Sequence, residues 1–222
     1  VEGFAADPSA AAYETLVEEW LGSPASAEHF ALQWLDLARY ADSNGYQHDG
    51  DRFAWPWRDW LVEALRVNRP LDELVVEMIA GDLLPGASEG QRLATAFLRM
   101  HPLNNEGGAI AEEVRFGYVV DRVNTVATSF LGLTLACAQC HDHKLDPISQ
   151  REYYEFFAFF DQLAEDGVVD ATRRNFYHQY QLEEPLLSLP EWQARVGGDV
   201  PQVMVAAERE TPRETRVRER GA

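Results

Sequence analysis

The chain has 222 residues, 46% of them hydrophobic and 25% charged, a composition typical of a globular protein that can bury a core. No apolar run approaches the ~18 residues that span a bilayer, so we expect no transmembrane segment. The net charge of −18 argues against nucleic-acid binding, because neutralising phosphates requires patches of Lys and Arg. The chain starts at Val1 without an initiator Met, so we expect a processed chain or an excised fragment.

The first 80 residues have the apolar spacing of helices. Helices are predicted over residues 10–21, 28–40, 57–65 and 71–78. Asp7-Pro8 predicts the N-cap and first turn of the first helix, since proline is favoured there. The second helix is apolar on two sides, so we expect it to be interior. The polar stretch 42–51 between the second and third helices predicts a loop.

A long apolar stripe dominates the middle of the chain. Ser88 and Gln91 form a capping box that predicts a fifth helix, and residues 104–108 predict a loop. From Ala109 onward, apolar residues recur every three or four positions, as on one face of a helix. The stripe consists of Val119, Val123, Val126, Phe130 and Leu133. Extended further, the same spacing puts Cys137 and Cys140 on the buried face of this helix.

The last part of the chain changes character. Ser149 and Glu152 predict a capping box for a helix with an aromatic side. Those aromatic and apolar residues are Tyr153, Phe156, Phe157, Phe160 and Leu163. Beyond residue 166, residues 183–189 are loop-like, whereas 203–205 and 215–218 show strand-like alternation. Two short strands cannot form an independent sheet, so this part either belongs to a following domain or lies along the helical body.

These patterns predict an all-α, mostly helical domain over residues 1–165. A short irregular or β-like extension over residues 166–222 would follow it, as a linker toward a following domain.

The residues that carry chemistry are Cys137-Ala138-Gln139-Cys140-His141, the attachment pattern of a c-type haem. Two thiols three positions apart can bond the two vinyl groups of one porphyrin, and the next residue, His141, then lies under the iron. Two alternatives remain open. The cysteines can form a redox-active thiol pair, or they can bind zinc together with His141 and His143.

Five sequence blocks resemble a known family. They are Trp34–Tyr46, Ala80–Pro85, Asn105–Ile110, Tyr118–Val123 and Cys137–Pro147. In this order, over roughly residues 8–165, they resemble the helical domain of unknown function of planctomycete-type multidomain cytochrome c proteins. The resemblance implies an exported bacterial protein, in the periplasm or at the cell surface. It also implies a partner, which is a redox protein or another haem domain of the same polypeptide. It implies no particular reaction, and the end of the chain from Pro201 resembles the start of a second domain.

The second axial position of the iron decides between electron transfer and catalysis. His101 is the first candidate for the sixth ligand and Met100 a weaker one, because Met in an apolar helix usually packs in the core. Met78 is weaker still. His143 is too close to His141 to reach the opposite face of the same haem.

We therefore expect electron transfer through one covalent haem c rather than an enzyme. Two alternatives are a haem enzyme with an open sixth position, in which Asn104 or Glu106 lies over the iron, and a zinc-stabilised structural module. Candidate propionate contacts are Arg39, Arg58, Arg115, His143 and Lys144. The loop 42–51 has oxygen ligands for calcium but lacks the spacing of an EF-hand, so a solvated loop is expected there.

Overall fold

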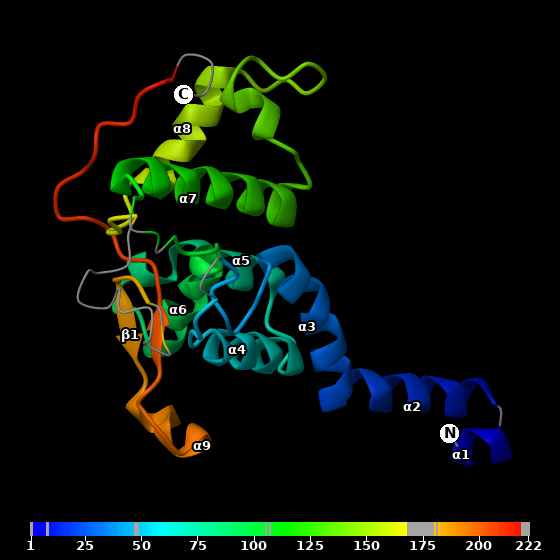
Figure 1. Cartoon of the computed structure of the whole chain (residues 1–222). Coiled ribbons are helices and arrows are strands. Elements are labelled where there is room, and N and C mark those ends of the chain that lie inside the picture. Colours follow the sequence, from blue (N-terminus) through cyan, green and yellow to red (C-terminus); the bar gives the residue numbers. More distant parts are fainter. Residues whose placement is uncertain are drawn as a thin grey trace.

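The fold is described from a computed structural model (Figure 1), which describes residues 2–7, 9–46, 49–104, 106, 108–167, 180 and 182–218. As predicted, it is mostly helical, with one small two-stranded sheet near the C-terminus. Some residues of the predicted elements lie outside the described residues. These are Pro8 of the first helix start, Gln47 and His48 of the 42–51 loop, Asn105 and Gly107 of the 104–108 loop, and 168–179, 181 and 219–222 of the extension.

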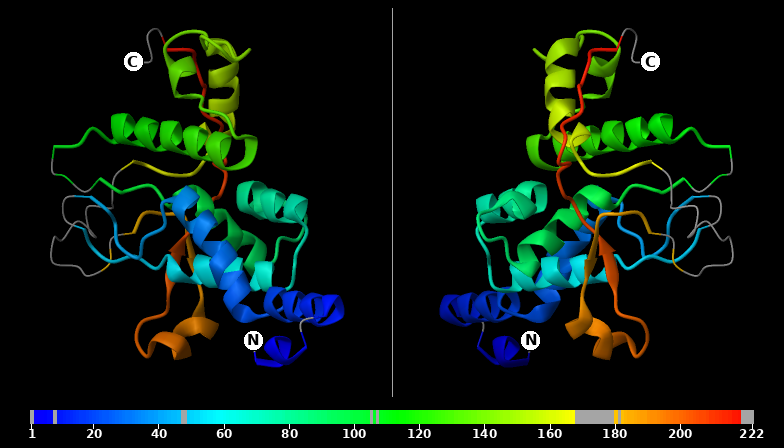
Figure 2. Two further views of the ribbon diagram at one scale, coloured as in Figure 1. Left: turned by 90° about the vertical axis from the view of Figure 1, so that its right-hand side faces the viewer. Right: turned by 90° about the vertical axis from the view of Figure 1, so that its left-hand side faces the viewer.

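A helical body carries the core. The α-helices are α1 (Glu2–Ala6), α2 (Ala10–Leu21), α3 (Pro24–Ala38), α4 (Trp55–Arg66), α5 (Leu71–Ala80), α6 (Glu89–Ala94), α7 (Ala111–Val126), α8 (Gln150–Asp161) and α9 (Gln193–Val196). Short turns of tighter or wider helix are η1 (Gly81–Leu83), η2 (Thr95–Arg99), η3 (Ala127–Leu131), η4 (Ala136–Gln139) and η5 (Pro190–Trp192). Helices α3 to α6 pack together, α7 lies across them, and α8 packs on the far side of α7 (Figures 1 and 2).

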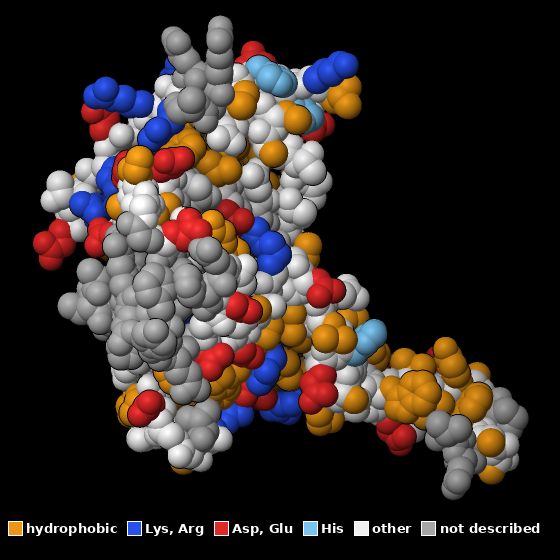
Figure 3. All heavy atoms as spheres, viewed as in Figure 1, with side chains coloured by type: hydrophobic (Ala, Val, Ile, Leu, Met, Phe, Trp, Pro, Cys, Tyr) orange, Lys and Arg blue, Asp and Glu red, His pale blue; other side chains and the backbone are white. Residues whose placement is uncertain are grey.

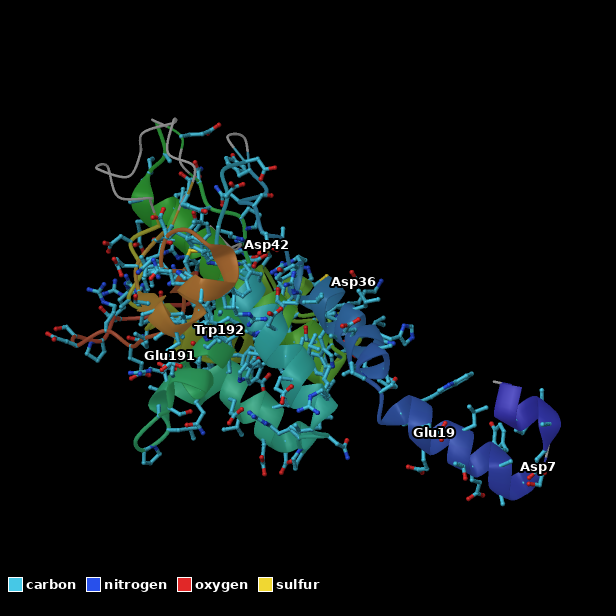
Figure 4. All side chains as sticks on the ribbon, turned by 90° about the horizontal axis from the view of Figure 1, so that it is seen from below. Asp7, Glu19, Asp36, Asp42, Glu191 and Trp192 are labelled. Carbon is cyan, nitrogen blue, oxygen red and sulfur yellow. The ribbon has the colours of Figure 1, made fainter. Side chains whose placement is uncertain are left out.

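Helices α1 and α2 form an arm that projects from the body (Figure 1). Helix α2 buries none of its twelve residues, and Tyr13, Trp20 and Leu21 are each more than half exposed. The space-filling view shows their hydrophobic surface gathered on the arm (Figure 3). Seen from below, Asp7 and Glu19 on the arm lie far from Trp192 on the body (Figure 4).

The predicted N-cap of this arm helix is wrong. Ser9, not Asp7, caps α2, because the Ser9 hydroxyl accepts a hydrogen bond from the Ala12 amide at 3.2 Å. The Asp7 carboxylate instead accepts from the Ser9 amide at 3.3 Å. A serine in extended backbone geometry satisfies one of the unpaired amides of the first turn, so the side chain nearer the helix takes the role.

Helix α3 is not interior, contrary to prediction. Its bulky Phe30 and Leu32 are 48% and 56% exposed, whereas its buried residues are the alanines Ala27, Ala31 and Ala38. These small side chains let α4 approach closely, and α3 makes its most extensive contact with α4. Apolar residues on two sides of a helix therefore did not indicate two buried sides.

The body is centred on Trp57 of α4, which is fully buried and donates its indole N–H to the Ala94 carbonyl at 3.1 Å. Helix α6 begins with the predicted capping box, because the Ser88 and Gln91 side chains each bond the other's backbone amide. Helix α8 begins with the same device, formed by Ser149 and Glu152. Both predictions are confirmed.

The predicted long helix does not reach the cysteines. Helix α7 ends at Val126 and continues as the wide turn η3 to Leu131, after which Gly132 adopts a left-handed φ of 64°. Glycine has no Cβ to clash in this conformation, so it ends helices readily. Phe130 nevertheless follows the predicted stripe into the core, where its ring centroid lies 5.2 Å from that of Phe97. The cysteines fall in a separate turn, η4.

The described part of the extension contacts the helical body at several places, among them Trp192 against Trp55 and the Ala206 amide, which donates to the Thr95 hydroxyl. Strands β1 (Leu186–Ser188) and β2 (Gln202–Met204) pair antiparallel. Residues 183–189, which were predicted to be loop-like, therefore contain a strand. Residues 215–218 were predicted to be strand-like but form no strand. Instead, the tail (residues 205–218) passes α7 and reaches α8 (Figures 1 and 2). Gln162, the C-cap residue of α8, bonds both backbone groups of Arg213. The described tail therefore runs along the helical body.

Candidate functional site

The Cys-Ala-Gln-Cys-His sequence lies in the thiol segment (residues 133–149), which connects Gly132 to α8. Cys137 and Cys140 are both exposed and both free thiols, which contradicts the prediction that they lie on a buried helix face. Leu135 and Ala138, in contrast, are buried. The segment is thus anchored by Leu135 and Ala138, while Cys137 and Cys140 are exposed.

The two thiols lie one tight turn apart. The amides of Cys140 and His141 both donate to the Cys137 carbonyl, at 3.3 Å and 3.4 Å. In a turn with three residues per revolution, side chains three positions apart lie above one another. Cys137 lies within η4 and Cys140 is its C-cap residue, so we expect the two thiols on one side of the turn.

His141 is exposed, and its ring has a defined orientation. Its Nδ1 lies 2.8 Å from the Asp142 carbonyl oxygen, which can only accept, so Nδ1 carries the proton. Within the described part of the chain, Nε2 has no hydrogen-bond partner. A backbone carbonyl that fixes one imidazole nitrogen in this way is the usual support of a metal-ligating histidine.

The neighbouring polar groups stabilise the segment itself. His143 Nδ1 accepts from the Asp146 amide at 2.9 Å and lies 3.3 Å from the Asp146 carboxylate. Gln150 of α8 donates to the Gln139 carbonyl at 3.0 Å, and the Tyr154 hydroxyl donates to the same oxygen at 3.3 Å. These bonds fix the backbone between the two cysteines without using either sulfur.

The zinc alternative requires several ligand side chains to converge on one point. Among the residues that the structure describes, which include Cys137, Cys140, His141 and His143, no three His, Cys, Asp or Glu side chains converge as they do around a metal ion. In the 42–51 loop, the carboxylate of Asp42 accepts from the Tyr40 hydroxyl and that of Asp49 from the Gly45 amide. The carboxylates of Asp42 and Asp49 therefore already have hydrogen-bond donors.

The structure does not bring the two predicted sixth ligands to the thiol segment. His101 and Met100 are buried on the side of α7 that faces η2, whereas η4 packs on α8. Both nitrogens of His101 have partners, because Nε2 accepts from Arg122 at 3.0 Å and Nδ1 lies 3.1 Å from the Pro102 carbonyl. Met78 is fully buried in the core.

The other candidates are distributed over the body. Arg39 is paired with Asp121, and Arg58 with Asp59. Arg115 pairs with both Glu112 and Asp161 beside α8. The backbone amide of Asn104 donates to the Tyr118 hydroxyl, and its side-chain oxygen accepts from the Glu106 backbone amide. Lys144 is exposed on the thiol segment.

Sequence reasoning missed a buried charge cluster around His101. It comprises Arg99, His101, Arg122, Glu165 and Glu183, each at most 5% exposed. Arg122 donates to the Leu98 carbonyl at 2.7 Å and to both carboxylate oxygens of Glu165. Arg99 pairs with Glu183 at 3.2 Å and with Glu165 at 3.8 Å. A signal in the sequence is that Arg99 lies in the otherwise apolar stretch 96–100.

The electrostatics of the cluster are strongly coupled. Burial alone would raise the pKa of Glu165, but the guanidinium groups of Arg122 and Arg99 outweigh it and hold that pKa below its ordinary value. Burial, together with the same two arginines, lowers the pKa of His101 well below its ordinary value. His101 is therefore a neutral hydrogen-bond acceptor for Arg122 in the folded protein.

This neutral histidine predicts a loss of stability in acid. Below about pH 6.5 an unfolded histidine takes up a proton that folded His101 does not, so the free energy of unfolding falls as the pH falls. Below pH 6.5, His101 should lower the free energy of unfolding by up to about 1.4 kcal/mol for each pH unit of acidification. Above pH 6.5 it should have no such effect. Urea denaturation between pH 7.5 and 5 should show a smaller acid slope in His101→Gln than in the wild type. His29→Gln, at an exposed position on α3, is the control; equal slopes in all three proteins would contradict the prediction.

Fold and site together define a mostly helical domain that presents two free thiols and an oriented histidine on one exposed turn. A family model described as "PSCyt2: Protein of unknown function (DUF1549)" matches residues 1–165, most of the chain. The chain belongs to this family. No curated protein and no solved structure matches it. In the described residues, no helix is both long and apolar enough to cross a membrane.

Proposed function

We propose that this chain attaches one haem c through Cys137 and Cys140, with His141 as the proximal ligand, and transfers electrons. The observation that carries the proposal is the orientation of His141. Its Nδ1 is held by a carbonyl 2.8 Å away, and its Nε2 is free beside two exposed thiols that share one side of a turn. The residues of the segment therefore fit the group that the sequence pattern implies.

The roles of the residues follow from their chemistry. Each thiol would add across one vinyl group, with sulfur bonding the inner carbon and the thiol hydrogen going to the outer carbon, so the attachment consumes no oxidant. His141 would donate its Nε2 lone pair, and the Asp142 carbonyl would strengthen this donation by holding the Nδ1 proton. The bound haem would supply a one-electron Fe(III)/Fe(II) couple.

The family description includes no function, so the setting of this activity belongs to the proposal. We infer an exported protein in the periplasm or at the cell surface. Its partner would be a redox protein or another haem domain of the same polypeptide. Neither predicted sixth ligand, His101 or Met100, lies at the thiol segment. Carbon monoxide binds iron whose sixth position is open, so its binding distinguishes a closed electron-transfer centre from an open, catalytic one.

The test is expression of the chain with a haem-maturation system in an oxidising compartment. The wild type should retain its haem through denaturation, and Cys137→Ala with Cys140→Ala should lose it completely. His141→Ala should weaken or abolish attachment and change the reduced spectrum, because the iron loses its axial nitrogen. His143→Ala is the matched control, since it is two residues away and its Nδ1 is used by the Asp146 amide.

The outcomes separate the alternatives. If carbon monoxide leaves the reduced spectrum of the covalent haem unchanged, the result supports electron transfer. If the covalent haem binds carbon monoxide readily, the result supports the haem enzyme. A matured wild type without covalent haem would overturn the proposal. Zinc in the purified chain would then support the structural module.

A further inference from the structure

A cavity of about 560 Å³ lies between α7, α8 and the tail. Four guanidinium groups line it, those of Arg115, Arg213, Arg216 and Arg218. The three carboxylates in its wall belong to Glu112, Asp161 and Glu214. The cavity wall is thus net positive, in a chain whose net charge is −18.

The three carboxylates of the cavity wall form ion pairs with two of these arginines, Arg115 and Arg216. Arg115 bonds Asp161 at 2.6 Å and Glu112 at 2.7 Å, and Arg216 bonds Glu214 at 2.6 Å. Each of these three carboxylates thereby has a guanidinium partner already, which leaves the other two arginines without one.

Arg213 and Arg218 have no carboxylate partner within the described residues. Arg213 donates to the carbonyls of Asp161, Leu163 and Glu165, at 2.7 to 2.8 Å. Arg218 places its guanidinium carbon 4.1 Å from the centroid of the Phe116 ring. A guanidinium stacked on an aromatic face keeps its N–H edge free to bind an oxyanion.

Both cations and carboxylates act on Arg213. Burial and the neighbouring Arg115 and Arg209 lower its pKa, whereas Asp161 and Glu112 raise it.

The cavity adjoins the thiol segment. Gln150 donates both to the Gln139 carbonyl, between the two cysteines, and to the Arg218 carbonyl, each at 3.0 Å. One side chain thus connects the backbone of the proposed haem-attachment turn to the residue that carries the unpaired guanidinium.

We propose that this cavity binds an oxyanion, a carboxylate or phosphate group, with Arg218 as its main ligand. Two sources share this chemistry, a propionate of the haem and a small free anion. The first source rests on the proposed function, and the second does not.

The first experiment uses the haem-free chain. Inorganic phosphate and malonate are titrated into it by calorimetry, with sodium chloride at equal ionic strength as the reference. We expect binding that weakens at least about tenfold in Arg218→Gln, because one charge-assisted hydrogen-bond pair is lost. Arg151→Gln is the matched control. It removes the same charge from α8 beside Gln150, but Arg151 is 81% exposed and does not line the cavity.

The second experiment repeats the titration on the haem-loaded chain and measures its midpoint potential. If a propionate occupies the cavity, phosphate no longer binds, and Arg218→Gln changes the potential more than Arg151→Gln. If phosphate binds the loaded and haem-free chains equally, the ligand is a free anion. No binding beyond the chloride reference, together with equal potentials in the two variants, would overturn the proposal. If no covalent haem forms, the proposed function fails, and the first experiment alone decides on the cavity.

Discussion

Gly167→Ala should lower the free energy of unfolding by at least about 4 kcal/mol. A Cβ at this position would lie 2.2 Å from the Ala111 carbonyl oxygen and 2.6 Å from the Arg115 amide. Both atoms belong to the backbone of the first turns of α7, which cannot retreat without breaking helical hydrogen bonds. Gly167 also has a φ of 77°, a left-handed conformation that disfavours any side chain. The measurement is chemical denaturation followed by far-ultraviolet circular dichroism.

Gly86→Ala provides the matched control. Gly86 has a similar φ of 68°, but among the described residues nothing lies within 4 Å of the Cβ that alanine would add. It should therefore cost only the conformational strain, about 1–2 kcal/mol. The difference between the two variants measures the contact with α7. Equal costs would show that residue 167 does not approach the helix this closely.

Arg122→Met should destabilise the fold by about 3–5 kcal/mol, because it leaves a carboxylate buried without its main partner. Glu165 would lose both hydrogen bonds from Arg122 and keep only Arg99, 3.8 Å away. The Leu98 carbonyl and His101 Nε2 would lose their donor as well. Methionine fills a similar volume, so the loss reflects charge and hydrogen bonding rather than a cavity.

The control for this prediction is Arg39→Met. Arg39 also forms a two-pronged pair with a carboxylate, that of Asp121, at 2.5 Å and 2.7 Å. Its side chain is 44% exposed, however, and exposed pairs contribute at most about 1 kcal/mol. Guanidinium chloride denaturation of both variants tests the comparison. A loss below about 1 kcal/mol in Arg122→Met would indicate that water reaches Glu165 in the folded protein.

The helical content could be predicted because its signals are local. The Ser88 and Ser149 capping boxes formed as expected, since each depends on residues three positions apart. The stripe from Val119 to Phe130 lies in α7 and η3 as its spacing indicated. The prediction failed where the stripe passed Gly132, because periodicity alone does not detect a left-handed residue that ends a helix.

The candidate site was predictable only in part. The spacing of Cys137, Cys140 and His141 predicts the chemistry. The backbone between the cysteines is held by α8 through Gln139, and the His141 ring is oriented by the Asp142 carbonyl. His101 was chosen as a sixth ligand from its position in a loop. In the structure it accepts from Arg122, which is 21 residues away, and sequence spacing contains no information on such a pair. Nor does it indicate that the tail brings Arg218 to Phe116.

Local sequence patterns predict the mostly helical fold, the starts of most helices, and two thiols and a histidine at haem-attachment spacing. These properties follow from hydrogen bonds and side-chain directions that repeat within a few residues. The tertiary contacts set three further properties: the thiols are exposed, Arg122 bonds both His101 and Glu165, and an arginine-lined cavity adjoins the thiol segment. These properties depend on contacts between residues far apart in the chain, where burial sets the strength of each charge and hydrogen bond.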